Sequence, residues 1–206
     1  MGQGPATEAG VKALLEQGRL DAAEQLCSKV AKSGVSSAMA PALLMLAQAC
    51  HAAGRTSSAA AWLRRLANAA PNAQDLEAAR LAQVLERPQV ACLLFEKADK
   101  HRALSTADRL NMAKVTLTTA ESLRLPRGRH GAWALHEEML QKAAQQFAEL
   151  TQVEDAELGE QVEVWTGLAR VLRLQRADAT RIELALARAA ALLAGLPSAN
   201  VLVRSG

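Results

Sequence analysis

Apolar residues recur every three or four positions along this chain, and the pattern is interrupted at short, regular intervals. A spacing of three and four places apolar side chains on one face of an α-helix. Gly18, Gly34, Gly54 and Pro71 fall between the apolar stretches, where they end helices. The pattern therefore predicts a string of helical hairpins joined by short turns.

The predicted helices form five consecutive pairs. The first three pairs cover residues 7–17 with 20–32, 37–53 with 56–68, and 73–86 with 88–100. Two pairs of longer helices follow, beginning at a capping box of Ser105 and Asp108 and ending before Pro197. Their apolar stripes contain Leu110, Ala113, Leu117 and Ala120, then Trp133, Leu140, Ala143, Phe147 and Leu150, then Leu158, Val162, Trp165, Ala169 and Leu172, and finally Ile182, Leu186, Ala189 and Leu193.

These pairs predict an all-α fold of about ten helices, since no alternating apolar and polar run is long enough for a strand. No linker rich in Gly, Ser or Pro divides the chain. We expect a single helical-repeat domain over 1–206. Within it lie three hairpins in 6–100, two longer and irregular hairpins in 105–196, and a tail in 197–206. A compact bundle of the last four helices is the alternative arrangement.

The composition supports a folded, helical chain without naming a partner. Half of the 206 residues are apolar, which is enough for a sizeable core. With 2 Phe, 3 Trp and no Tyr, the core must be mainly Ala and Leu, and base-stacking platforms are not expected. The formal net charge of +3 is spread through a chain that holds both signs, as is ordinary for solubility.

No catalytic or metal-binding constellation stands out. Cys27, Cys50 and Cys92 lie far apart, without the paired spacing of a zinc site, so buried thiols are expected. His130 and His136 lack the second His four residues on that a zinc helix needs, and we interpret them as part of a solvated helix start. Without a phosphate-binding glycine loop or a nucleophile elbow, we predict neither an enzyme nor a cofactor.

The location of the protein is predicted from what its first residues lack. MGQGPATEAG has no basic region followed by an apolar stretch, and no later run reaches the roughly 20 uncharged residues that span a bilayer. Ala6 stands where an N-myristoylation signal needs Ser or Thr. We therefore expect a cytoplasmic protein with no membrane partner.

The segment Ala42–Asn72, ALLMLAQACHAAGRTSSAAAWLRRLANAAPN, resembles a tetratricopeptide repeat (TPR) without a gap. The matching positions are Leu43, Leu46, Ala47, Cys50, Gly54, Ala59, Leu63 and Pro71. The first hairpin repeats the pattern with Leu14, Gly18, Leu20, Ala23, Cys27 and Val30, and the third with Ala91, Phe95 and Ala98. The resemblance covers about residues 6–100 and weakens beyond them.

The resemblance implies a TPR-like α-solenoid, a right-handed superhelix of stacked antiparallel helix pairs. It further implies a concave groove that binds a peptide or helix of a partner protein. The implied groove positions are Glu8, Lys12, Glu16, Leu44, Gln48 and His51. Leu44 and Gln48 replace basic or amide residues of the family's carboxylate clamp, so a partly apolar segment such as an amphipathic helix is expected instead. The alternative is that these residues face solvent without a special role.

A protein-binding adaptor or scaffold is the preferred function, and a chaperone of a secreted or assembling client is the alternative. Self-association is expected chiefly for a chaperone with an empty groove. Arg124, Arg127 and Arg129 in the long turn are predicted to meet an acidic protein surface. Together with His130 in the same turn and with Arg170, Arg173 and Arg176, they could also bind phosphates, but the missing aromatics make a nucleic-acid partner the weaker hypothesis. The apolar residues Val201, Leu202 and Val203 of the tail are expected to dock back on the helices or on a neighbouring molecule.

Overall fold

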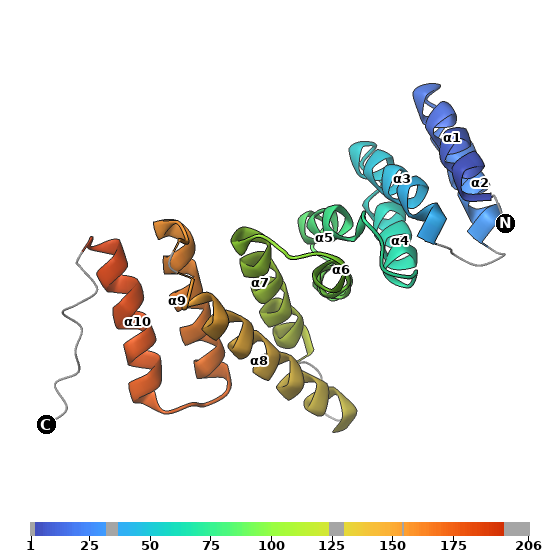
Figure 1. The fold of residues 1–206 in the computed structure, drawn as a ribbon. Helices are drawn as coiled ribbons and strands as arrows, with labels where there is room; N and C mark the ends of the chain where they lie inside the picture. The colour runs from blue at the N-terminus through green and yellow to red at the C-terminus, as the bar shows by residue number, and fades with distance from the viewer. Residues whose placement is uncertain (1–2, 32–36, 124–129, 154, 196–206) are drawn as a thin grey trace, which may run out of the picture. The chain divides into compact units, whose positions relative to one another are not determined.

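The structure is a computed structural model that describes residues 3–31, 37–123, 130–153 and 155–195. Over these residues it contains ten α-helices, one short 3-10 helix and no strand (Figure 1). The α-helices are α1 (Gln3–Glu16), α2 (Leu20–Ala31), α3 (Ala40–Ala52), α4 (Thr56–Ala67), α5 (Asp75–Val84), α6 (Pro88–His101), α7 (Thr106–Leu123), α8 (His130–Leu150), α9 (Leu158–Leu174) and α10 (Ala179–Leu193), and the 3-10 helix is η1 (Ser37–Met39). The predicted all-α fold is confirmed.

The helices pair in sequence order within two compact units. Unit 1, Met1–Ala103, contains the pairs α1–α2, α3–α4 and α5–α6, and unit 2, Leu104–Gly206, contains α7–α8 and α9–α10. In unit 1, α3 packs on α1 and α2, and α4 packs on α5 and α6; in unit 2, α9 packs on α7 and α8. Each unit thus stacks helical hairpins as a TPR-like α-solenoid does. The single domain over 1–206 stays a prediction.

Four hairpins share one turn geometry. Each has a residue in the left-handed region, namely Gly18 (φ 69°), Gly54 (φ 73°), Glu86 (φ 55°) and Arg176 (φ 55°). The next backbone N–H then donates to the carbonyl five residues earlier, as in Arg19–Leu14 (2.8 Å), Arg55–Cys50 (2.8 Å), Arg87–Ala82 (2.9 Å) and Ala177–Leu172 (2.9 Å). This pairing satisfies carbonyls at the end of the first helix. The α9–α10 turn is therefore regular, although the sequence predicted an irregular hairpin there.

Small and aliphatic side chains fill the space between the helices of unit 1. The TPR-like positions Ala23, Cys27, Leu43, Leu46, Ala47, Cys50, Ala59, Leu63, Ala91 and Phe95 are all fully buried, as the resemblance implied. Burying a Leu side chain stabilises the fold by about 1.5–3 kcal/mol, and Ala at the crossings lets the backbones approach. The core is thus built from the residues that define the repeat.

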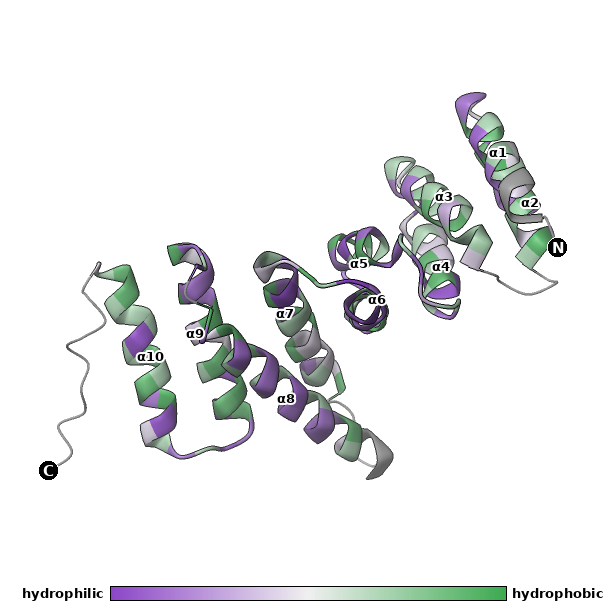
Figure 2. Cartoon of the chain, viewed as in Figure 1, coloured by the Kyte–Doolittle hydropathy of each residue, from purple (hydrophilic) through white to green (hydrophobic). Residues whose placement is uncertain are grey.

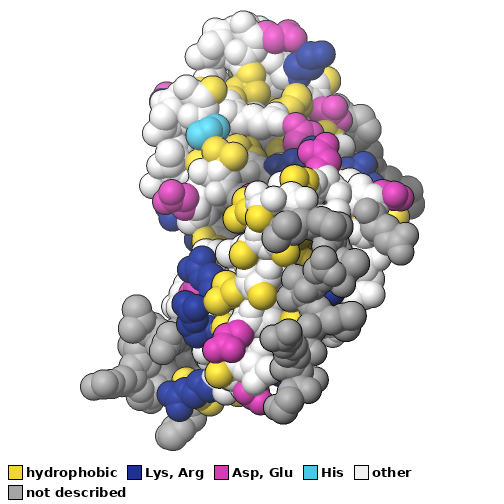
Figure 3. Space-filling view, turned by 90° about the vertical axis from the view of Figure 1, so that its left-hand side faces the viewer, with side chains coloured by type: hydrophobic (Ala, Val, Ile, Leu, Met, Phe, Trp, Pro, Cys, Tyr) yellow, Lys and Arg dark blue, Asp and Glu magenta, His cyan; other side chains and the backbone are white. Residues whose placement is uncertain are grey.

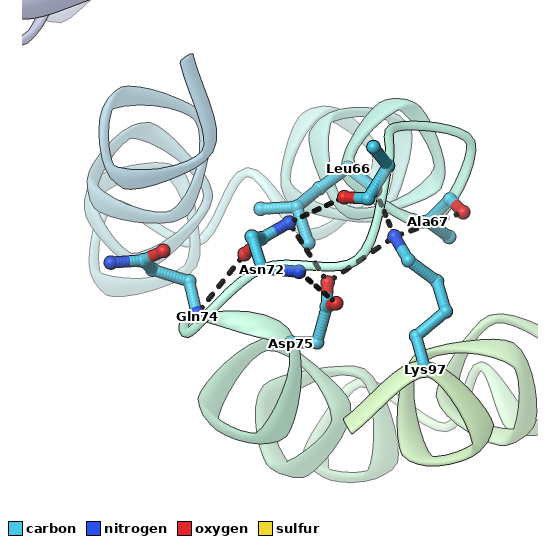
Figure 4. Close-up of polar contacts among 7 residues, drawn as sticks. Leu66, Ala67, Asn72, Gln74, Asp75 and Lys97 are labelled. Carbon is cyan, nitrogen blue, oxygen red and sulfur yellow. Dashed lines mark hydrogen bonds and ion pairs between the residues drawn. The ribbon is translucent and has the colours of Figure 1, made fainter. Parts of the chain in front are cut away.

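A buried polar network ties α4, α5 and α6 together (Figure 4). The fully buried Asp75 accepts a hydrogen bond from the Asn72 N–H at 2.8 Å, at the start of α5. Lys97 Nζ of α6 lies 3.3 Å from Asp75 Oδ1 and donates to the carbonyls of Leu66 (3.0 Å) and Ala67 (3.3 Å). The Lys97 ammonium therefore neutralises the carboxylate and satisfies the last carbonyls of α4.

A second polar contact joins the first two hairpins through Glu24 of α2. Its Oε1 accepts hydrogen bonds from Trp62 Nε1 of α4 at 3.2 Å and from Cys50 Sγ of α3 at 3.6 Å. Its Oε2 lies 3.2 Å from Arg55 Nη1 in the α3–α4 turn. One carboxylate thus contacts three segments of the next hairpin.

Unit 2 has its own core, in which α9 crosses α8 closely. Leu110, Ala113, Leu117, Ala120, Leu140, Ala143, Phe147, Leu150, Val164 and Val171 form one buried cluster. At the crossing, a Cβ on Gly167 would lie 2.4 Å from a ring carbon of Phe147. Ser105 accepts a hydrogen bond from the Asp108 N–H at 3.2 Å, which confirms the predicted cap at α7.

Four of the apolar side chains that the sequence assigned to buried stripes in this half are exposed. Trp133 at the start of α8, Leu158 at the start of α9, and Leu186 and Leu193 on α10 all contact solvent. Their predicted burial is wrong, because in the described part of the chain no further helix lies over them. Figure 2 shows apolar residues along much of α10, whereas α8 displays mainly polar residues.

Candidate peptide-binding face

The candidate face begins on α3, where Leu44, Gln48 and His51 follow one another at helical spacing. Intervals of four and three place these residues on the same side of the helix. Gln48 is exposed and His51 is half-buried, whereas Leu44 is only 4% exposed. The expectation that Leu44 lines a groove is therefore corrected: it is a core side chain, and the accessible part of this stripe is polar.

The position of Gln48 recurs in all three hairpins of unit 1. Lys12, Gln48 and Arg80 each stand six residues before the left-handed turn residue, which is Gly18, Gly54 and Glu86 in turn. All three side chains are exposed. Since each belongs to the first helix of its hairpin, the repeat presents one long polar side chain per hairpin. We call Lys12, Gln48 and Arg80 the first-helix column.

A hydrogen bond between side chains links two consecutive first helices at this column. Gln48 Nε2 of α3 donates to Glu77 Oε1 of α5 at 2.6 Å, and both side chains are exposed. The bond fixes the Gln48 amide, so that its carbonyl oxygen has a defined orientation. Exposed polar side chains held in this way can hydrogen-bond to the backbone of another polypeptide.

His51 adds a nitrogen without a hydrogen-bond partner. Among the described residues, its Nδ1 is buried and has no partner, although the ring as a whole is half-buried. A buried polar atom without a partner costs roughly 1–3 kcal/mol.

The remaining predicted positions of the face lie on α1. Lys12 and Glu16 are exposed and Glu8 is half-buried. Sequence reasoning missed Glu77 and Arg80. Counting six residues back from Glu86 would have found Arg80, but a glutamate does not mark a turn as a glycine does. No sequence signal pointed to Glu77, because its role depends on the approach of α5 to α3.

The structure describes only some of the predicted arginine sites. Arg124, Arg127 and Arg129 lie outside the described residues. Arg170 of α9 pairs with Glu121 of α7, with Nε and Oε1 2.7 Å apart. Lys114 of α7 likewise pairs with Glu163 of α9. These pairs join the first helices of the two hairpins of unit 2.

The three thiols are buried, as expected from the sequence. Burial raises the pKa of Cys27 to about 11, and the positive charge of Arg65 offsets this only in part. Burial also raises the pKa of Cys50 to about 11, with a further rise from the neighbouring Glu24 carboxylate. Both groups are therefore neutral thiols at physiological pH and weak nucleophiles.

His136 is not part of a solvated helix start, and that interpretation is wrong. The side chain is 3% exposed, and its Nδ1 donates to the carbonyl of Ala120 on α7 at 2.7 Å. The ring also stacks obliquely with Trp133, with centroids 5.5 Å apart. His136 thus fastens α8 to α7.

The described residues offer no group of three or more His, Cys, Asp or Glu side chains placed to hold a metal ion. In the same part of the chain, every helix is too short or too polar to cross a bilayer.

Antiparallel helix pairs with a shared turn and a recurrent column of first-helix side chains define a helical-hairpin repeat protein. Residues 14–85 match the family model of the tetratricopeptide repeat. This part of the chain is therefore similar to the tetratricopeptide repeat family.

Similar solved structures come from Podosopora anserina. The TPR-like repeats of a protein assigned as a kinesin light chain share 15% identity over 95% of this chain and 98% of that one, with a TM-score of 0.49. A point variant of those repeats also shares 15% identity, over 93% and 94% of the two chains, with a TM-score of 0.49. No curated protein matches the sequence.

Proposed function

We propose that unit 1 binds a peptide segment of a partner protein across the first-helix column. The proposal is supported by the match of residues 14–85 to the family model, because tetratricopeptide repeats generally mediate contacts between proteins and are generally not catalytic. The main supporting observation is that Lys12, Gln48 and Arg80 are all exposed and stand at the same position in three successive hairpins.

The chemistry of the column favours a polar, extended segment. Lys and Arg are donors with charge, and the Gln amide both donates and accepts, so together they suit backbone carbonyls and acidic side chains. Leu44 and Leu76, which precede the column by four residues on their helices, are 4% and 5% exposed. With these leucines covered, an amphipathic helix would find little apolar surface here, and it becomes the weaker hypothesis.

A chaperone role is the second candidate, and exposed apolar side chains favour it. Trp133 is 60% exposed and Leu193 is 74% exposed, both in unit 2. Large exposed apolar side chains are a feature of surfaces that bind other proteins. A chaperone should remain associated with its client during purification, whereas an adaptor should be stable alone.

Matched charge reversals test the column. The column variant carries Lys12→Glu, Gln48→Glu and Arg80→Glu. The control variant carries Lys29→Glu, Gln25→Glu and Arg64→Glu, which are the same residue types at exposed positions of the second helices α2 and α4. Both variants and the unchanged protein are cross-linked in the native cell, and the recovered partners are compared by mass spectrometry.

We expect the column variant to lose a partner that the control variant retains, while both keep the helical circular dichroism of the unchanged protein. Retention of every partner by a folded column variant would contradict the proposal. Equal losses from both variants would contradict it as well, because they would show a general effect of charge. Partners that depend on unit 2 alone would favour the chaperone role.

A further inference from the structure

An apolar cleft lies within unit 2, between α8, α9 and α10. Its volume is about 220 Å³. It is lined by Ala144, Ala148, Trp165, Leu168, Leu172, Gln175, Arg181, Leu184 and Ala185. Gln175 and Arg181 bring polar groups, and Trp165 adds an indole N–H. The cleft is smaller than the roughly 300–1,000 Å³ of a small-molecule pocket, so one or two aliphatic side chains would fill it.

α10 carries further exposed apolar side chains besides the cleft-lining Leu184. Leu184 is 42% exposed, and Leu186 and Leu193, which lie on the opposite side of the helix, are 39% and 74% exposed. Figure 3, which looks onto α10, shows apolar side chains in a column on this face, with Lys and Arg side chains along one edge. Within the described residues no helix follows α10 to cover this surface.

The chain itself supplies a short apolar segment soon after α10 in the sequence. α10 ends at Leu193, and Gly195 two residues later has a φ of 64°, in the left-handed region that turns a chain away from a helix axis. Residues 196–206 follow and lie outside the described part of the structure. They contain Val201, Leu202 and Val203 in succession.

The spacing along the chain matches the distance to the cleft. From Leu184 to Gly195, α10 rises by roughly 16 Å at 1.5 Å per residue. The six residues from Gly195 to Val201 span up to roughly 20 Å when extended. A segment that folds back along α10 therefore brings Val201 to Val203 level with the cleft.

We propose that the chain's own Val201–Val203 segment covers the cleft, with Leu202 inserted between α8, α9 and α10. In an extended segment successive side chains point to opposite sides, so that Leu202 enters while Val201 and Val203 lie along the rim. Because the segment is tethered six residues away, its effective concentration at the cleft is high, and a few apolar contacts suffice. An outside apolar segment reaches the cleft only after this one leaves.

Thiol labelling of the full-length chain tests the proposal. Leu184→Cys places a reactive group in the cleft, and Leu186→Cys places one at an equally exposed position that does not line the cleft. Each is combined with Leu202→Asp or with Ser205→Asp, which adds the same charge to the tail. The rate of alkylation by iodoacetamide is then measured. The native cysteines are buried and serve as the slow background.

We expect Leu202→Asp to raise the labelling rate at Leu184→Cys several-fold, with no change for Ser205→Asp and no change at Leu186→Cys. Equal rates at Leu184→Cys in all tail variants would overturn the proposal. Should Leu184→Cys disturb the fold, Ala148→Cys provides the same comparison from α8.

A cross-link identifies the occupant directly. In a chain carrying Leu184→Cys and Leu202→Cys, the proposal predicts a disulfide within one molecule that forms equally well on dilution. A disulfide found only in dimers, and lost on dilution, would overturn the proposal in favour of a second copy. If no disulfide forms and the labelling rates are unchanged, the proposal is also overturned, and the cleft is then available to an outside partner.

Discussion

Lys97 of α6 places its Nζ 3.3 Å from Oδ1 of Asp75 on α5, and the Asp75 side chain is fully buried. The same ammonium donates to two carbonyls at the end of α4. When one partner of a buried ion pair is removed, the other charge is left without compensation, and this costs more than the intact pair contributes. Lys97 therefore holds three helices of unit 1 in register.

Replacing this lysine should destabilise the protein strongly. We expect Lys97→Met to lower the free energy of unfolding by about 3–5 kcal/mol, because Asp75 and the two carbonyls lose their partner. Adding Asp75→Asn should recover part of the loss, since the buried negative charge is then gone. Urea unfolding followed by circular dichroism measures both, with the exposed Lys100→Met as the control. A loss in the double variant as large as the sum of the two single losses would show that the charges are not coupled.

The close crossing of α8 and α9 should not tolerate a methyl group at Gly167. Its Cβ would lie 2.4 Å from the Phe147 ring, so Gly167→Ala should lower the free energy of unfolding by about 1–3 kcal/mol. Gly159 on the same helix has no atom within 4 Å of its added Cβ. Gly159→Ala should leave stability unchanged or raise it by up to about 1 kcal/mol. Equal effects in thermal unfolding would argue against a tight crossing.

At two turns, replacing the native residue with glycine should make the protein more stable. Glu86 and Arg176 adopt a φ of 55°, where a side chain costs roughly 1–2 kcal/mol. Glycine removes this strain and loses some of the gain to the greater freedom of the unfolded chain. We expect Glu86→Gly and Arg176→Gly each to raise the free energy of unfolding by about 0.5–1 kcal/mol. Gly54→Ala is the converse test, and it should lower the free energy of unfolding. A loss of stability in Glu86→Gly and Arg176→Gly would contradict the idea that these turn residues are strained.

The thiols should make the protein less stable in alkali. The pKa values of Cys27 and Cys50 are raised from 9.0 to about 11 in the folded protein, so the folded state holds these protons more tightly than the unfolded state. Their contribution to stability is complete below pH 9 and is lost as the pH rises toward 11. Urea midpoints measured across this range should fall, and the fall should be smaller for Cys27→Ala. A fall in the midpoint that is the same with and without Cys27→Ala would contradict the raised pKa of Cys27.

Thiol reactivity offers a separate measurement. At pH 8 the native cysteines should react with a disulfide reagent far more slowly than they do in urea, because both burial and the neutral thiol form protect them. Fast reaction of Cys27 or Cys50 in the folded protein would show that the helices open locally.

The hairpins of unit 1 could be predicted from the sequence because local and tertiary signals agree there. Leu43, Leu46 and Ala47 lie at helical spacing, and Gly54 marks the turn that the backbone needs. The turn at Arg176 has the same hydrogen bonds without a glycine, so no residue in the sequence marks it as a turn. A strained turn residue is held by the packing of its helices, which a single sequence does not display.

The face was predicted only in part, for a similar reason. Lys12 and Gln48 were predicted from the resemblance of their hairpins to the tetratricopeptide repeat, in which a glycine marks the turn, whereas Arg80 stands at the same offset from a glutamate. Leu44 was misplaced because helical spacing gives the side of a helix but not how far a neighbouring helix covers it. The same reason explains Leu193, which belongs to an apolar stripe yet is exposed.

Glu24 has polar partners in three segments of the next hairpin. Because one carboxylate serves Cys50, Arg55 and Trp62, a change at any of these four positions leaves the other three in an unsuitable environment. In diverging sequences these four positions should change together or not at all. An aligned set of relatives should therefore display them as a covarying group that spans the first two hairpins.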